Sequence, residues 1–266
     1  MSSLSQSTDT TPNGQIEKTE LHVEHREENH EDLGHHRFEA DTDELPKGYF
    51  TSLQFIGSAL GVGMNLMGST AGFAIVAPVL SQIDVAIGPG PVTWLALVYT
   101  LGLAIGLTLV GRLSDIFGRR WFFISGVCLG VIGSIIGATA NTIPVLIGGQ
   151  TLIGLSASTG YSYAFVIGEL VPLKYRFMAN GILFLFSMPT AGFGAAISTA
   201  FILYTKAGWR WCYYLLIILN GVTALLYFFF YYPPNFRAKN SGVSKWDLIK
   251  DFDYVGTLLY LAGLLL

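Results

Sequence analysis

The residues best suited to chemistry lie in one short segment, from Gly111 to Arg120, with the sequence GRLSDIFGRR. Its one carboxylate, Asp115, lies among three arginines, so we expect it to be ion-paired. Gly111 and Gly118 permit a tight turn between antiparallel helices. Charges of this kind can hold two helix ends in one packing and release them in another. The alternative interpretation is that the arginines only set which side of a membrane the turn occupies.

Residue groups typical of enzymes are missing from the sequence. No glycine-rich phosphate loop with a following Lys-Ser or Lys-Thr occurs, so ATP-driven chemistry has no support. All five histidines lie within residues 1–46, where we interpret them as incidental, and Cys128 and Cys212 lie in separate apolar runs. We therefore expect no enzyme activity, no catalytic residues, no metal site, no cofactor and no nucleic-acid partner.

The segment is surrounded by apolar runs that are too long for soluble helices. Hydrophobic residues make up 52% of the chain and charged residues only 12%, where a soluble domain carries about 25% charged residues. A membrane-spanning helix needs about 20 apolar residues, and in lipid the backbone must satisfy its own hydrogen bonds. The sequence predicts six spans, at residues 53–80, 91–111, 120–140, 143–168, 177–203 and 210–232.

The parts outside the six spans differ from them in composition. Residues 1–47 are polar and acidic, and we expect a disordered tail. Residues 48–236 form the predicted transmembrane bundle, and 237–253 form a loop. Residues 254–266 begin a seventh apolar run that is too short to cross a bilayer, so we expect a truncated seventh span in a fragment of a longer protein.

Basic residues predict the orientation. The loops after spans two, four and six carry nine Lys and Arg residues, whereas the loops after spans one, three and five carry two. Because basic loops stay on the cytoplasmic side, we expect the even-numbered loops and the N-terminal tail to be cytoplasmic. Glycines spaced four apart, such as Gly126 and Gly130 or Gly133 and Gly137, predict close helix packing in an all-α bundle.

The segment resembles the signature loop of the major facilitator superfamily. It matches the family pattern at six positions and departs from it at Ile116, where the family usually has a basic residue. The matching residues are Gly111, Leu113, Asp115, Gly118, Arg119 and Arg120. The chain is most similar to fungal trichothecene and multidrug efflux pumps of the 14-span drug:proton antiporter type. The resemblance covers residues 50–266 and implies the N-terminal six-helix bundle of such a transporter, plus the start of a seventh span.

A second charged pair also resembles the family. Glu169 precedes Arg176 by seven positions, beside the loop after the fourth span. The resemblance implies that these two residues join the 111–120 charges in a cytoplasmic gating network. The residues of that network are Gly111, Asp115, Gly118, Arg119, Arg120, Glu169 and Arg176.

Other features of the spans match the family only in part. Pro189 and Gly192 retain two positions of an antiporter motif in the fifth span. Gln150 stands where drug antiporters usually have an arginine, which puts the family's proton-coupling residue in doubt. Because the first and fourth spans line the cavity in this fold, Asn65, Gln150 and Tyr161 are candidate cavity residues. The equally weighted alternative is that they form hydrogen bonds between helices.

The resemblance implies a secondary transporter in the plasma membrane that exports small hydrophobic compounds by alternating access. It implies proton coupling in the full-length form, and a second six-span half, either a missing C-terminal half or a second copy. Two alternatives remain. The chain is a non-transporting half or regulatory remnant, or, against the predicted orientation, a seven-span receptor.

Overall fold

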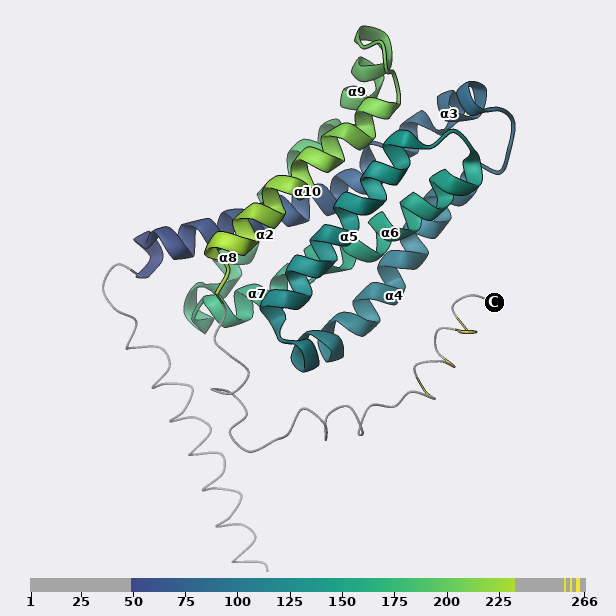
Figure 1. Ribbon diagram of the computed structural model, residues 1–266. Coiled ribbons are helices and arrows are strands. Elements are labelled where there is room, and N and C mark those ends of the chain that lie inside the picture. Colours follow the sequence, from purple (N-terminus) through teal and green to yellow (C-terminus); the bar gives the residue numbers. More distant parts are fainter. Residues whose placement is uncertain (1–48, 233–255, 257–258, 260–261, 264–266) are drawn as a thin grey trace, which may run out of the picture. The chain divides into compact units, whose positions relative to one another are not determined.

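The computed structural model describes residues 49–232 and the single positions 256, 259, 262 and 263. The predicted disordered tail (1–47), the loop 237–253 and most of the truncated seventh span (254–266) lie outside these residues. Every regular element within 49–232 is a helix, as predicted (Figure 1). The elements are η1 (Tyr49–Thr51), α2 (Leu53–Ala74), η2 (Ala77–Val79), α3 (Leu80–Ile87), α4 (Thr93–Phe117), α5 (Arg119–Thr139), α6 (Ile143–Tyr161), α7 (Tyr163–Leu170), α8 (Leu173–Leu185), α9 (Met188–Tyr204) and α10 (Arg210–Phe230).

Five helical segments are long and apolar enough to cross a membrane. They correspond to five of the six predicted spans. Three are single helices, at Thr93–Gly111, Arg119–Thr139 and Arg210–Phe230, and two contain a break, at Leu53–Ile87 and Leu173–Tyr204. The breaks follow from proline chemistry. Pro78 prevents α2 from continuing past Ala74, four residues earlier, and Pro189 has the same relation to Leu185, the last residue of α8.

The predicted fourth span, residues 143–168, is not among these five segments. In the structure it consists of α6 and α7, which are separated at Ser162. The hydroxyl of Ser162 donates a hydrogen bond to the carbonyl of Ser158 (2.6 Å), and side-chain bonds of this kind bend helices. Helix α6 also contains Gln150, Thr151 and two serines, Ser156 and Ser158. It packs against α2, α4 and α5, so it needs less apolar surface than a helix that faces lipid.

The helices pack with α2 and α6 at the centre. Helix α6 contacts α4 and α5, while α2 contacts α10, α8 and α9, and α10 also packs along α5. Figure 1 shows α5 and α10 side by side on one side of the bundle, with α4 beyond α6. The turn between α4 and α5 and the turn between α7 and α8 lie at the same end. Both turns belong to the loops predicted to be cytoplasmic.

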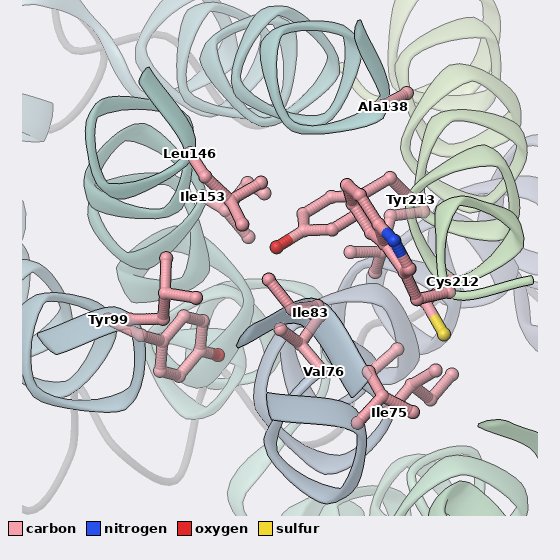
Figure 2. Packing of buried hydrophobic residues seen from close by; sticks show 14 of the residues in the cluster. Ile75, Val76, Ile83, Tyr99, Ala138, Leu146, Ile153, Cys212 and Tyr213 are labelled. Carbon is pink, nitrogen blue, oxygen red and sulfur yellow. The ribbon is translucent and has the colours of Figure 1, made fainter. Parts of the chain in front are cut away.

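Two hydrophobic clusters fill the interior. One contains Ile75, Ile83, Leu146, Ile153 and Leu216 among others, and Figure 2 shows Tyr213 of α10 reaching across it toward α6. The other lies toward the turn between α4 and α5. Its members include Val62, Phe123, Val127, Val166, Leu183 and Tyr227. Along α2, α5 and α10, buried polar residues occupy the stretch between the members of the two clusters.

Candidate functional site

The turn between α4 and α5 has the geometry that the 111–120 segment predicts. Helix α4 ends at Phe117, Gly118 has φ +89°, and α5 starts at Arg119. This backbone conformation is strained for residues with a side chain, so glycine is needed here. Gly111 lies within α4, one turn or more before the end of the helix, rather than in the turn itself.

The two carboxylates of the predicted gating network lie at described backbone positions, Asp115 in α4 and Glu169 in α7. Their side chains lie outside the described part of the structure, so the predicted ion pairs stay a prediction.

Two arginines at this end, Arg120 and Arg176, contact helix carboxyl ends. Arg120 donates from Nη2 to the carbonyl of Phe228 in the last turn of α10 (2.8 Å), and its guanidinium carbon lies 3.7 Å from the centre of the Tyr232 ring. Arg176 of α8 donates from Nη2 to the carbonyl of Gly168 in the last turn of α7 (2.6 Å). Carbonyls at a helix C-terminus lack intrahelical donors and carry partial negative charge, so they are favourable acceptors for a cation.

A third arginine makes the same kind of contact at the opposite end of the bundle. Arg210, the first residue of α10, donates from Nη2 to the carbonyl of Ala140 (3.0 Å) and to Oδ1 of Asn141 (3.2 Å). Ala140 is the residue that follows α5. Sequence reasoning did not find these contacts, because a backbone carbonyl as a partner leaves no signal in residue types.

Asn65 lies in the buried polar part of the interior. Only 1% of its surface is exposed, and its Nδ2 donates to Oγ1 of Thr159 in α6 (3.3 Å) and to the hydroxyl of Tyr227 in α10 (3.1 Å). Its Oδ1 is buried and has no hydrogen-bond donor in the structure. Asn65 thus connects three helices inside the bundle.

Gln150 of α6 makes a similar connection, to α2 and α10. It is also 1% exposed, donates from Nε2 to the carbonyl of Gly72 in α2 (2.9 Å) and accepts from the hydroxyl of Tyr213 in α10 (3.4 Å). The geometry of Asn65 and Gln150 fits the interpretation of hydrogen bonding between helices. Tyr161 differs, because it lies at the end of α6 and 37% of its surface is exposed.

Pro189 and Gly192 lie on α9. Pro189 is at the start of the helix, and both residues are exposed. A Cβ atom added at Gly192 would meet nothing within 4 Å, so no neighbour within the described bundle requires a glycine here. The structure therefore brings Asn65 and Gln150 into the interior, whereas Tyr161, Pro189 and Gly192 lie on the surface.

The exposed face of α2 carries a set of residues that sequence reasoning missed. Every third or fourth residue of this helix is partly or largely exposed, whereas the residues between them are buried against α6, α8, α9 and α10. We name these residues the α2 strip; they are Leu60, Met64, Met67, Thr70 and Phe73. Leu60 and Phe73 are exposed, whereas Met64, Met67 and Thr70 are partly exposed, and the two methionines also pack against the first hydrophobic cluster. The missed signal is their helical spacing within a helix that is apolar on all sides.

Comparisons with known proteins agree with the resemblance noted above. A family model described as fungal trichothecene efflux pump (TRI12) matches residues 17–266. The trichothecene efflux pump TRI12 of Trichoderma arundinaceum is 34% identical over 231 residues, which is 85% of this chain and 38% of that protein. Its namesake from Fusarium sporotrichioides is 31% identical over 222 residues, 83% of this chain and 37% of that protein.

A third relative, the MFS-type efflux transporter pyiT of Pyricularia grisea, is 33% identical over 173 residues, covering 64% of this chain and 28% of that protein. The chain thus spans less than two fifths of the length of these relatives. Their names describe efflux pumps and transporters rather than enzymes, which agrees with the prediction that this chain is not an enzyme. With its apolar helices, the chain is an integral membrane protein, and it belongs to the fungal trichothecene efflux pump family of major facilitator transporters.

Proposed function

We propose that the chain forms one six-span bundle of a transporter that exports small hydrophobic compounds by alternating access. The single observation that carries the substrate class is the α2 strip. It contains two methionines, an aromatic ring and a hydroxyl, and no ionisable side chain. Methionine side chains are flexible and polarisable, so they adapt to apolar molecules of different shapes. Phe73 adds a flat apolar face beside Tyr99 of α4, at 5.7 Å between ring centres.

The position of the strip on α2 supports this proposal. Helix α2 is covered by α10 and α6 on its buried sides, and the strip faces away from them. Major facilitator transporters bind substrate between two six-span halves. We therefore propose that a second six-span half, in a longer form of this protein or in a second copy, faces the α2 strip across the substrate.

An efflux assay tests this proposal. The full-length transporter is expressed in a yeast strain sensitive to hydrophobic toxins, and efflux of a radiolabelled hydrophobic compound is measured for Met67→Ala and for the matched control Leu225→Ala. Leu225 is on α10 and 60% exposed. We expect Met67→Ala to change the apparent KM for efflux several-fold and Leu225→Ala to leave it unchanged. The substrate role of the strip would be contradicted if both substitutions changed the apparent KM equally, or if neither changed it.

The gating network remains part of the proposal. Two observations support it. Gly118 turns the chain sharply three residues after Asp115, and Arg176 binds the carbonyl of Gly168, the residue that precedes Glu169. Breaking a buried ion pair by removing one partner costs about 3–5 kcal/mol, enough to shift a two-state gate. We expect Asp115→Asn to lower efflux while membrane insertion and protein amount stay normal. Efflux by this variant at the unsubstituted rate would rule out a gating role for Asp115.

The coupling ion and the membrane also belong to the proposal. We propose that the full-length transporter is coupled to protons, as a 14-span antiporter, and lies in the plasma membrane with its N-terminus in the cytoplasm. The orientation is supported by the basic residues of the turns at one end of the bundle. Collapse of the proton gradient with a protonophore should abolish efflux. Protease added to intact protoplasts should leave an epitope in residues 1–47 uncut.

A further inference from the structure

The antiparallel pair α5 and α10 meets in the same register along its whole length. Phe123 and Tyr227 form a ring contact with 6.3 Å between ring centres. Seven residues further along α5, a Cβ added at Gly130 would lie 3.3 Å from Cγ of Asn220. After seven more, a Cβ added at Gly137 would lie 2.4 Å from the ring of Tyr213. We name these residues the α5–α10 seam; they are Phe123, Gly130, Gly137, Tyr213, Asn220 and Tyr227.

The repeat of seven residues keeps the seam on one side of both helices. Helices that pack with a seven-residue repeat insert the side chains of one helix between those of the other. In the seam, Gly137 on α5 receives the ring of Tyr213, whereas Gly130 lies against both Ser156 of α6 and Asn220 of α10. Glycine allows helix backbones to approach closely in a membrane, where apolar burial alone does not favour association.

Both ends of the pair carry an arginine that binds the other helix. Arg120, at the start of α5, binds the carboxyl end of α10 through the Phe228 carbonyl and the Tyr232 ring. Arg210, at the start of α10, binds the residues that follow α5, Ala140 and Asn141. Each arginine therefore connects the first turn of one helix to the carboxyl end of the other. Because the two helices are antiparallel, the two contacts lie at opposite ends of the pair.

These contacts oppose sliding of one helix along the other. An axial shift by one helical turn, about 5.4 Å, would carry either guanidinium out of hydrogen-bond range of its carbonyl. Either contact alone opposes such a shift, because both helices are stiff along their axes. We propose that Arg120 and Arg210 together lock the register of α5 and α10, so that this pair moves as one body when the rest of the bundle rearranges. The proposal does not depend on which substrate is carried.

Distance measurements between spin labels test the lock. Labels are attached at Ile135→Cys on α5 and Leu225→Cys on α10 in the full-length protein reconstituted in lipid. Both positions are exposed, and in this register they lie about 15 Å apart along the helix axes, so a slide changes the distance between the labels. Cys128, which is exposed, is replaced by Ser, and the buried Cys212 is retained. We expect one narrow distance population in the otherwise unsubstituted protein. Each of the single variants, Arg120→Gln and Arg210→Gln, should show the same population. The double variant Arg120→Gln/Arg210→Gln should show a second population, displaced by several ångströms as one helix slides by about one turn along the other.

Arg176→Gln is the matched control, since Arg176 also binds a helix carboxyl end but not in this pair. It should leave the distance unchanged. An unchanged distribution in the double variant would overturn the proposal, and so would equal broadening in Arg176→Gln. If the double variant does not fold, Arg120→Lys/Arg210→Lys serves instead. Lysine keeps the charge but not the planar fork, so we expect a smaller second population, and its absence would also overturn the lock.

Discussion

Helix α10 and helix α9 are held in the bundle in different ways. Helix α10 meets α5 at every seventh residue, and an arginine connects the two helices at each end of the pair. Helix α9 meets α2 at few points: a Cβ at Gly194 would lie 2.7 Å from the carbonyl of Ala74, and Thr190 donates to the carbonyl of Met67 (3.2 Å). Much of α9 is exposed, including Phe193 at 68%.

The two helices differ in the features that hold membrane helices together. Both helices are apolar around their whole circumference, so apolar content does not distinguish them. What differs is the number of positions at which small residues and hydrogen bonds allow close approach. In lipid these features drive association, because lipid tails are as apolar as the side chains they would replace. We expect α10 to be the more firmly held of the two.

The largest expected effect comes from filling the α5–α10 seam. Gly137→Leu places a Cβ 2.4 Å from the ring of Tyr213, which is fully buried and cannot move aside without disturbing its neighbours. We expect a loss of about 3 kcal/mol in the free energy of unfolding. Gly192→Leu on α9 is the control and should be tolerated, since its Cβ has open space. Thermal unfolding in detergent measures both, and equal losses would remove the distinction between the two helices.

A smaller effect is expected where α6 reaches the seam. Gln150→Leu removes the hydrogen bond to the Gly72 carbonyl and leaves the buried hydroxyl of Tyr213 without its acceptor. We expect a loss of about 1.5 kcal/mol in the free energy of unfolding, mostly from that unpaired hydroxyl. The neighbouring Thr151→Val is the control, because the Thr151 hydroxyl bonds only to its own helix and is exposed. A Gln150→Leu variant as stable as the control would show that the contact contributes nothing.

Substitutions at two tyrosines of α10, one buried and one exposed, test whether its two sides differ. Tyr227→Phe deletes the hydroxyl that accepts from Asn65 Nδ2, so one amide hydrogen loses its partner. Hydrogen bonds between membrane helices contribute about 0.6–1.7 kcal/mol, and we expect a loss of about 1 kcal/mol. Tyr214→Phe, on the exposed side, should change nothing measurable. Unfolding by increasing SDS in mixed micelles resolves this difference, and the reverse ranking would contradict the interior placement of Asn65.

The smallest expected effect tests the contact of α9 with α2. Thr190→Val removes the hydrogen bond to the Met67 carbonyl and should cost about 0.6 kcal/mol, the average for such bonds in membrane proteins. Thr199→Val, further along α9, is the control, because its hydroxyl bonds within α9. If Thr190→Val were as costly as Gly137→Leu, α9 would be held as firmly as α10.

Much of the fold could be predicted from residue types along the chain. Uncharged runs about as long as a bilayer is thick identify the spans, because a helix satisfies all its backbone hydrogen bonds within one such run. The spans predicted at 120–140 and 210–232 correspond closely to α5 and α10. The turn at Gly118 follows equally well from its sequence. The family resemblance noted in the same segment is confirmed by the family model that matches residues 17–266.

The fourth span shows where this kind of prediction loses accuracy. Its run of residues predicts one helix over 143–168, whereas the structure breaks it at Ser162. At the break the Ser162 hydroxyl bonds to the carbonyl four residues earlier, but Ser134 and Thr223 make the same kind of bond in the unbroken helices α5 and α10. Serine is common in unbroken helices too, so its presence alone does not predict the break.

Residue types along the chain were enough to identify the helical segments, the charged turns and the family. The direction in which each helix faces required the packed bundle, because a helix that is apolar all round has no polar side to indicate its orientation. That orientation brought Asn65 and Gln150 into contacts between helices, and it exposed the α2 strip. It also gave Arg120 and Arg210 backbone carbonyls as partners. Every residue carries such a carbonyl, so only the packing of helix ends determines which one an arginine binds.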